Sequence, residues 1–205
     1  MLRPPARPAW WMRSRPWREA EFASLDFETT GLDRERDAVV SFGIVPVRAG
    51  RVVVGEAVHR LVLPEVPPSP ESMRIHGILP KDLAPAQPFP AAGQTLRLGL
   101  AGRFLLAWFA GVEIGYLGRL YGGRRRSWVR RTIDVRQMAI ELEHLDQDVR
   151  QSLSSAAKHY GVPVAHPHEA LDDAIVTAQL FLVLACRLEE RGLGTVRSFL
   201  GLTRP

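Results

Sequence analysis

Extended segments come first in the hydrophobic pattern of this chain. Apolar side chains at 22–27 predict a short strand that ends at a Thr-Thr-Gly sequence. Residues 38–47 and 51–63 predict two more strands, and Ala49-Gly50 between them is typical of a tight hairpin turn. The first part of the chain is therefore predicted to form strands.

Helical periodicity dominates the rest of the pattern. An apolar strand at about 103–107 runs into a helix that begins near Gly111, and 135–144 and 153–160 predict further helices. The last helix starts after His168, where apolar residues repeat at steps of three and four: Leu171, Ala174, Ile175, Ala178 and Leu182. Strands followed by a mixture of helices and strands favour an α/β fold with a mixed sheet.

Two internal segments follow neither period. Residues 64–90 contain eight prolines, so we expect loops and short helical turns there. Residues 121–131 are rich in arginine, which favours a solvated basic loop, with contact to phosphate as the alternative.

The N-terminal residues 1–20 are rich in proline, arginine and tryptophan. Four prolines argue against a regular helix or strand. One interpretation is an arm that stacks bases on Trp10, Trp11 and Trp17 and contacts phosphates through arginine. The interpretation we favour is a tail that packs loosely on the domain or on a partner.

Composition narrows the class of protein. A length of 205 residues fits one domain, and 46% apolar content is that of an ordinary globular protein. The net charge of +5 and the pI of about 10.1 favour acidic partners such as nucleic acid. Lys81 and Lys158 are the only lysines among 27 basic residues, a bias that phosphate binding and genome composition would each produce.

The cellular compartment follows from what the sequence does not contain. Cys186 is the single cysteine, so no internal disulfide forms, which suits a reducing compartment. The longest apolar run, 104–117, is too short for a membrane span, and the N-terminus has no apolar core like that of a signal peptide. We therefore expect a cytoplasmic protein.

Candidate chemistry begins with Asp26 and Glu28 in the first predicted strand. They are two positions apart, so both project from one face while Leu25 and Phe27 point into the core. Two carboxylates on one face repel each other unless a cation lies between them. Such oxygen ligands suit Mg²⁺ or Mn²⁺, but this short pattern is common and needs further support.

Four longer segments supply that support. Residues 25–32 read Leu-Asp-Phe-Glu-Thr-Thr-Gly-Leu, and 168–174 read His-Glu-Ala-Leu-Asp-Asp-Ala. Between them lie Ile-His-Gly-Ile at 75–78 and Thr-Ile-Asp at 132–134. In order and spacing these segments resemble the DEDDh family of 3′→5′ exonucleases, which includes the proofreading epsilon subunit of bacterial DNA polymerase III and ribonuclease T.

The resemblance covers about residues 21–190 and implies a single domain. The fold that it implies is a ribonuclease H-like α/β fold, with a mixed five-stranded sheet and flanking helices. The predicted organisation is therefore an N-terminal arm at 1–20, an exonuclease domain at 21–190 and a C-terminal tail at 191–205. No clamp-binding peptide is evident near the C-terminus, so the sequence does not indicate a protein partner.

The middle motif departs from the family pattern. The family usually reads His-Asn-Ala-x-Phe-Asp, whereas residues 108–113 read Trp-Phe-Ala-Gly-Val-Glu. The next residues, 114–117, fit well and place Glu113 at the expected aspartate. The resemblance implies a metal-ligating role for Glu113, one methylene longer than usual. The alternative is a residue that merely favours the start of a helix through the helix dipole.

The resemblance also implies a mechanism with two ions, Mg²⁺ or Mn²⁺, on the scissile phosphate. Asp26, Glu28 and Asp173 would hold the first ion, and Asp26 would share the second with Glu113 through water. His168 lies before the last helix and would, as a neutral imidazole, take a proton from the attacking water.

The same resemblance implies a pocket for the terminal nucleotide. The residues that would hold it are Thr29, Thr30, Gly31 and Leu32, and His76 would line its wall. A purely structural turn histidine is the alternative for His76.

Together these expectations describe a metal-dependent 3′→5′ exonuclease that releases 5′-mononucleotides from the 3′ ends of single-stranded DNA or RNA. One alternative is a nucleic-acid-binding or regulatory module whose catalysis has decayed in the middle motif. Another is an exonuclease specialised for short oligonucleotides. The sequence does not decide between DNA and RNA, because the 2′-hydroxyl is read by details of the pocket.

Overall fold

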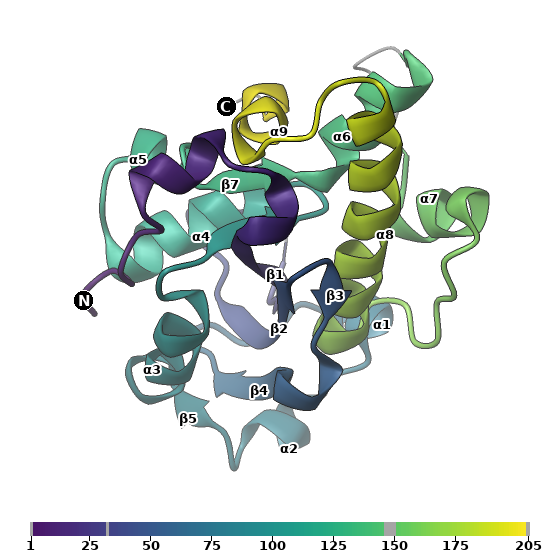
Figure 1. The fold of residues 1–205 in the computed structure, drawn as a ribbon. Helices are drawn as coiled ribbons and strands as arrows, with labels where there is room; N and C mark the ends of the chain where they lie inside the picture. Colours follow the sequence, from purple (N-terminus) through teal and green to yellow (C-terminus); the bar gives the residue numbers. More distant parts are fainter. Residues whose placement is uncertain (1, 32, 146–150, 204–205) are drawn as a thin grey trace.

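The computed structural model describes residues 2–31, 33–145 and 151–203. A seven-stranded mixed sheet forms the centre of this part of the chain (Figure 1). The strands are β1 (Glu21–Thr29), β2 (Val39–Arg48), β3 (Arg51–Val52), β4 (Val58–Leu63), β5 (Gln87–Pro88), β6 (Phe104–Ala107) and β7 (Thr132–Asp134).

The strand order is β5-β4-β2-β1-β6-β7, and β3 pairs with the end of β2. β1, β2 and β4 are antiparallel neighbours, whereas β6 and β7 run parallel to β1. The sheet has two more strands than the five expected, because the two-residue strands β3 and β5 add to it. The single strand expected at 51–63 is wrong: a 3₁₀ turn, η3 (Val54–Glu56), separates β3 from β4.

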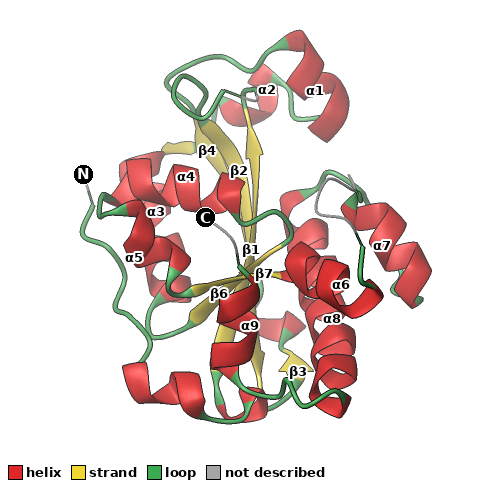
Figure 2. Cartoon of the chain, turned by 90° about the horizontal axis from the view of Figure 1, so that it is seen from above, coloured by secondary structure: helices red, strands yellow, loops and turns green. Residues whose placement is uncertain are grey.

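Helices cover both faces of the sheet. Figure 2 shows α3, α4 and α5 on one side and α6, α7 and α8 on the other. The helices are α1 (Pro70–His76), α2 (Pro80–Leu83), α3 (Phe89–Leu100), α4 (Gly111–Tyr121), α5 (Arg125–Val129), α6 (Val135–Glu143), α7 (Leu153–Tyr160), α8 (Ala170–Glu190) and α9 (Val196–Leu202). Within the described ranges, no helix combines the length and apolar character that a membrane span requires.

Each face of the sheet has its own apolar core. Leu25 and Phe27 pack in the core beneath α3 and α4, as their alternation in β1 predicts. Phe22 packs in the opposite core, with Phe181 of α8 at a ring-centroid distance of 4.8 Å. The central strand is therefore covered on both sides, and polar side chains on it must find partners within the protein.

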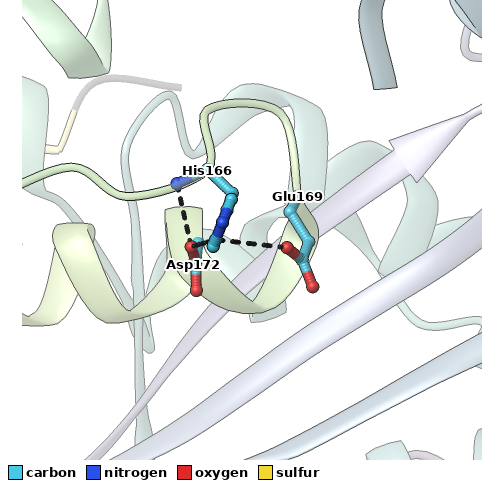
Figure 3. A group of neighbouring side chains, drawn as sticks. All are labelled: His166, Glu169 and Asp172. Atoms are coloured by element: carbon cyan, nitrogen blue, oxygen red, sulfur yellow. Dashed lines mark hydrogen bonds and ion pairs between the residues drawn. The ribbon is translucent and has the colours of Figure 1, made fainter. Parts of the chain in front are cut away.

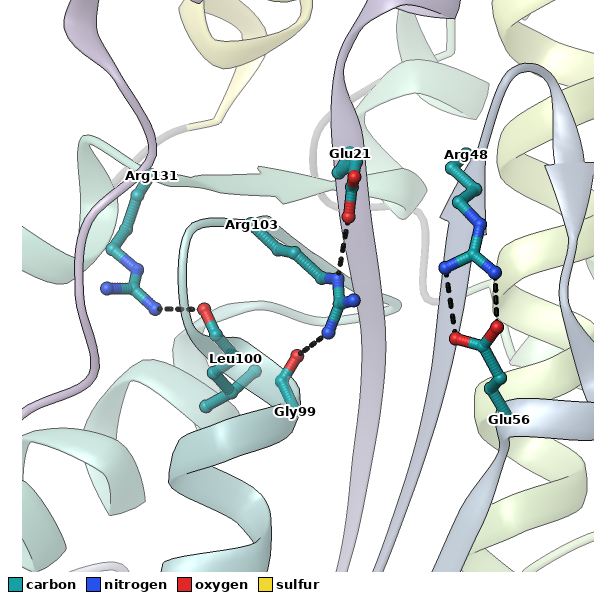
Figure 4. A network of polar contacts seen from close by, with 7 residues as sticks. All are labelled: Glu21, Arg48, Glu56, Gly99, Leu100, Arg103 and Arg131. Atoms are coloured by element: carbon teal, nitrogen blue, oxygen red, sulfur yellow. Dashed lines mark hydrogen bonds and ion pairs between the residues drawn. The ribbon is translucent and has the colours of Figure 1, made fainter.

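The expected hairpin joins β2 to β3. Ala49 and Gly50 both have positive φ, +50° and +68°, as the two central residues of a type I′ turn require. Beside the turn, the guanidinium of Arg48 forms a two-pronged ion pair with Glu56 (Figure 4). This ion pair links the end of β2 to the 3₁₀ turn that follows β3.

The N-terminal residues form two 3₁₀ turns, η1 (Trp10–Ser14) and η2 (Trp17–Glu19). Trp17 is buried to 1% exposure, and its ring meets Phe181 edge-on. Trp10 and Trp11, in contrast, are exposed. The three tryptophans therefore have different roles in the fold.

We expected the arginine-rich segment 121–131 to be a solvated loop, but the structure shows that only part of it is. Its middle forms α5, and Arg131 is buried with its guanidinium 4.7 Å from the ring centroid of Trp128. Arg131 also donates to the carbonyl oxygen of Leu100 at 3.4 Å (Figure 4). The segment is structured because the aromatic ring and backbone carbonyls together replace the water that a buried guanidinium loses.

The C-terminal residues also differ from the tail we expected. They form α9, whose side chains Val196 and Phe199 are fully buried. The hydroxyl of Thr203 accepts from the backbone N–H of Asp134 at 2.9 Å and donates to the carbonyl of Thr132 at 3.0 Å. The end of the described chain thus packs against the edge strand β7.

Candidate active site

Three predicted carboxylates meet at the carboxyl end of β1. Asp26 and Glu28 project from this strand, and Asp173 projects from the first turn of α8. One ligand oxygen from each lies within 4.8 Å of the others. Residues almost 150 positions apart in sequence therefore form one cluster of hard oxygen ligands.

A close backbone contact makes this meeting possible. Gly43 in β2 is the register partner of Asp26. A Cβ at Gly43 would lie 2.2 Å from the carbonyl oxygen of Ala170 and 2.4 Å from the Cα of Leu171. Only glycine lets the start of α8 approach the sheet this closely, and that approach brings Asp173 to the carboxylates of β1.

Burial and mutual repulsion raise the pKa values of these groups. Burial is the largest cause for Asp26, whose pKa lies well above its usual range, and the charges of Glu113, Glu28 and Asp173 raise it further. Burial and the charges of Asp173 and Glu113 raise the pKa of Glu28 to about 8. Burial likewise raises the pKa of Asp173. A divalent cation would relieve this repulsion, so the residues fit a metal site.

Glu113 faces the same cluster from the first turn of α4. It is not one of the three grouped carboxylates, but its charge acts on both Asp26 and Glu28. Burial raises the pKa of Glu113 to about 8, and its Oε2 is buried with no hydrogen-bond partner among the described residues. A buried carboxylate oxygen that receives no hydrogen bond is a ligand atom that a cation could engage.

Asp134 is a structural carboxylate by comparison. Its Oδ1 caps α6 by accepting from the backbone N–H of Gln137 at 3.2 Å. Its Oδ2 accepts from the backbone N–H of Ala110 at 3.1 Å, just before α4. Both oxygens are engaged by backbone donors, and Asp134 thereby fixes the start of the helix that carries Glu113.

His168 lies in the turn before α8 with its side chain exposed. Its backbone is in the left-handed region, with φ of +64°, and its N–H donates to Oδ2 of Asp173 at 3.1 Å. The predicted base is thus anchored through its backbone to one of the clustered carboxylates, while its ring remains accessible to a water molecule.

A cavity of about 200 Å³ adjoins Glu28. Its wall includes Thr29, Gly31 and His76, three of the residues predicted to hold a nucleotide, together with Ser72 and the half-exposed Ile75. An apolar side chain this exposed beside a polar cavity offers a surface on which a base can pack.

One other predicted pocket residue, Thr30, is not part of the wall of this cavity. Thr30 is buried, and its hydroxyl donates to Oδ1 of Asp37 at 2.9 Å and accepts from the N–H of Ala38 at 2.9 Å. Thr30 therefore shapes the turn and does not line the cavity. Leu32 lies outside the described residues.

His76 ends α1 beside the cavity. Its Nδ1 accepts from the backbone N–H of Ile78 at 3.0 Å, which fixes the ring. Burial lowers the pKa of His76, so the neutral form is favoured near neutral pH. The structure therefore gives His76 a structural hydrogen bond as well as a place in the wall of the cavity.

The altered middle motif places one aromatic side chain against the core and leaves a second one half-exposed. Trp108 packs against the core on the α8 side of the sheet. Phe109 is half-exposed, with the guanidinium of Arg136 at 5.6 Å from its ring centroid. A half-exposed aromatic ring of this kind can stack on a base, whereas Arg136 itself is buried.

A second group of possible ligands lies on the outer side of the first turn of α8 (Figure 3). Nδ1 of His166 is 2.8 Å from Oδ2 of Asp172 and 3.8 Å from Oε2 of Glu169. These side chains are more exposed than the first cluster, and the histidine pairs with the carboxylates. The group is thus held together without a cation.

Sequence reasoning did not identify Gly43, Ile75 or Asp172 as site residues. Ile75 and Asp172 lie inside the recognised motifs, so the signal was present in their neighbours. Gly43 has no local signal, because its role depends on a helix that begins more than 120 positions later.

The fold places the chain among ribonuclease H-like exonuclease structures, which confirms the expected fold class. It resembles exonuclease X in complex with 5′-overhanging duplex DNA, with a TM-score of 0.70 and 22% identity over 89% of this chain and 99% of that one. It also resembles the nuclease domain of 3′hExo, a DEDDh family member bound to rAMP, with a TM-score of 0.68 and 17% identity over 88% of this chain and 97% of that one.

The family follows from the sequence comparison. The exonuclease family model RNase_T matches residues 24–181, and the chain belongs to this family. It is 31% identical over 177 residues to a DNA polymerase III PolC-type protein of Thermotoga maritima, covering 85% of this chain and 12% of that protein. It is 29% identical over 186 residues to a DNA polymerase III subunit epsilon-like protein of Rhodobacter capsulatus, covering 88% of this chain and 26% of that protein. The chain thus spans about an eighth to a quarter of the length of these relatives.

Proposed function

We propose that this exonuclease-family chain removes 5′-mononucleotides from the 3′ ends of single-stranded nucleic acid in a reaction that depends on Mg²⁺ or Mn²⁺. The observation that carries the proposal is the convergence of Asp26, Glu28 and Asp173 within 4.8 Å, with His168 bonded through its backbone to Asp173. Buried carboxylates with raised pKa values and a nearby accessible imidazole fit metal-assisted hydrolysis.

Asp26, Glu28 and Asp173 would hold one ion, and Asp26 with Glu113 would hold a second. The bound ions would supply Lewis-acid stabilisation of the charge that develops on the phosphate oxygens. Two observations support this assignment: Oε2 of Glu113 is buried without a hydrogen-bond partner in the described part of the chain, and the pKa values of Asp26 and Glu113 are raised. Both mean that the ionised carboxylates are poorly stabilised by the protein, and a bound cation would stabilise them.

His168 would act as the general base. Its exposed ring can accept a proton from the water that attacks the scissile phosphate. The hydrogen bond from its backbone N–H to Asp173 holds the turn near the metal cluster. The base is therefore positioned by the same carboxylate that would bind the ion.

The terminal nucleotide would enter the cavity beside Glu28. Its base would pack on Ile75, and its sugar would lie near Thr29, Gly31 and His76. The cavity adjoins the cluster through Glu28, so a nucleotide seated there presents its phosphate to the carboxylates. Binding of a terminus in this way favours an exonuclease over an enzyme that cuts within a strand.

The test uses single strands of DNA, RNA and a dinucleotide, each labelled at the 3′ end or at the 5′ end. A 3′ label should appear at once as a mononucleotide in Mg²⁺ or Mn²⁺, and chelator should stop its release. Mononucleotides released first from the 5′ end, or full activity in chelator, would refute the proposal.

Two variants make the test specific to the cluster. Asp173→Asn removes one ligand charge, and Glu190→Gln removes a charge of the same kind from the far end of the same helix. Activity lost in the first and kept in the second would support the proposed site. Equal activity in both would point to a contaminating nuclease or to a module without catalysis of its own.

A further inference from the structure

A pair of hydrogen bonds ties the turn before α8 to the first turn of that helix. Oδ2 of Asp172 accepts from the backbone N–H of His166 at 3.0 Å and from its Nδ1–H at 2.8 Å (Figure 3). An ionised carboxylate only accepts, so Nδ1 carries the proton. We name these two bonds the His166–Asp172 clasp. They close a short loop that contains His168.

His168 occupies an unusual place within this loop. Its φ of +64° is unfavourable for a residue with a Cβ, so it persists only where surrounding contacts fix it. The adjacent aspartates provide those contacts. Asp173 holds the backbone N–H of His168 itself, and Asp172 holds the loop two residues earlier.

We propose that the His166–Asp172 clasp is a positioning device for His168, an inference that rests on the proposed exonuclease function. The ring of His168 is exposed, so its backbone does most to decide where the ring can reach. Without the clasp the turn would sample other conformations, and fewer molecules would hold the imidazole at the attacking water. His166 and Asp172 would then affect catalysis without touching the substrate.

Glu169 provides a matched control for charge. Its carboxylate is 3.8 Å from Nδ1 of His166, beyond hydrogen-bond reach, and its side chain makes no capping bond to α8. Burial is the main cause of the raised pKa of Asp173, and the charges of Asp172 and Glu169 raise it further. A change at Glu169 therefore removes a comparable charge but leaves the clasp intact.

The test is a double-mutant cycle between Asp172→Ala and His168→Ala, with 3′-labelled single-stranded DNA in saturating Mn²⁺. Asp172→Ala should lower kcat on the order of tenfold and change KM less than about twofold, because substrate binding does not use the clasp. Glu169→Ala should keep kcat within about twofold of the wild type. Asp172→Asn keeps an acceptor oxygen and should retain most of kcat.

The His168→Ala background separates positioning from a general structural effect. There, Asp172→Ala should cost nothing further, because no imidazole remains to be misplaced. The same loss in both backgrounds would overturn the proposal, since Asp172 would then act through the fold or through Asp173.

Hydrogen exchange gives a readout that needs no activity. The backbone amides of His166 and His168 should exchange faster in Asp172→Ala than in Glu169→Ala, because only the first change opens the loop. Equal exchange in the two variants would overturn the clasp. A wild-type chain without metal-dependent 3′ nuclease activity would overturn the proposed function and the positioning role with it, and the exchange data would show whether the clasp nevertheless exists.

Discussion

Asp172 and Asp173 are neighbours in sequence but belong to two clusters with opposite properties. Asp173 turns toward the sheet and joins Asp26 and Glu28, a buried group of like charges with raised pKa values. Asp172 turns outward and pairs with His166. In the first group, which we call the inner cluster, like charges repel one another, whereas in the second, which we call the outer cluster, the carboxylate of Asp172 accepts two hydrogen bonds.

The difference between the two clusters shows that the reactive carboxylates and the residues that hold them in place are different groups. The inner cluster is unfavourable on its own, so its geometry must be maintained by contacts elsewhere. Gly43 brings the helix to the sheet, Asp134 fixes the start of α4, and Asp172 secures the turn of His168. These three contacts lie outside the inner cluster, and they support the carboxylates that we propose to bind a cation.

Removing a charge from the inner cluster should produce the largest effect. Asp26→Asn keeps the size of the side chain but weakens binding of both proposed ions. We expect kcat to fall on the order of 10³-fold or more, because residues that act as a unit are lost together. Steady-state rates on 3′-labelled single strands, compared with Glu190→Gln, measure this. A loss smaller than tenfold would mean that Asp26 is not a shared ligand.

The close approach of α8 to the sheet can be tested at Gly43. Gly43→Ala places a Cβ against the backbone of Ala170, so α8 must move away from β1. We expect a loss of about 1–3 kcal/mol of unfolding free energy and on the order of 10²-fold in kcat. Gly118→Ala in α4 is the control, because its Cβ would meet nothing within 4 Å. Denaturant unfolding and rates for both variants decide the matter, and equal behaviour would contradict the close-approach argument.

Glu113 tests whether charge or reach matters at the edge of the inner cluster. Glu113→Gln removes the charge and should lower activity about tenfold or more. Glu113→Asp keeps the charge, and a water molecule can span the missing methylene, so its loss should be smaller. Titration of activity with Mn²⁺ should show weaker apparent binding in Glu113→Gln. Similar, small effects of both changes would favour a structural glutamate at the start of α4.

The sequence was sufficient for those parts of the site that lie in local motifs. Alternation in β1 predicted that Asp26 and Glu28 share a face, and the helical spacing after His168 predicted α8. The contact between these elements was not predictable from periodicity, because it depends on a glycine in β2 that has no pattern of its own. Only the family resemblance predicted that the motif in β1 and the motif at the start of α8 belong to one site.

Composition gave the least reliable expectations. Trp17 and Arg131 stand in segments that resemble solvated, basic termini and loops, yet both are buried. Their burial depends on partners distant in sequence, Phe181 and the carbonyl of Leu100. Residue types that favour the surface on average become core residues where such partners exist, and a single sequence does not reveal them.

The smallest expected effect is a difference in thermal stability between neighbouring aspartates. The raised pKa of Asp173 means that the folded state holds its proton more tightly than the unfolded state, so the cation-free protein loses stability as pH rises from the ordinary aspartate pKa through the raised one. Asp173→Asn removes this penalty and should raise Tm by a few degrees at pH 8 in chelator, about 1 kcal/mol for a chain of this length. The gain should shrink at pH 3, below the ordinary aspartate pKa, where the wild-type carboxyl is largely protonated in both the folded and the unfolded state. Asp172→Asn should give no such gain, because the carboxylate of Asp172 is already engaged by two donors of His166. Thermal unfolding of both variants at the two pH values, with and without Mn²⁺, measures the contrast.

Added Mn²⁺ should reverse the order at pH 8 by stabilising the wild type more than Asp173→Asn. Equal shifts in the two variants would mean that the inner and outer clusters do not differ as their contacts indicate.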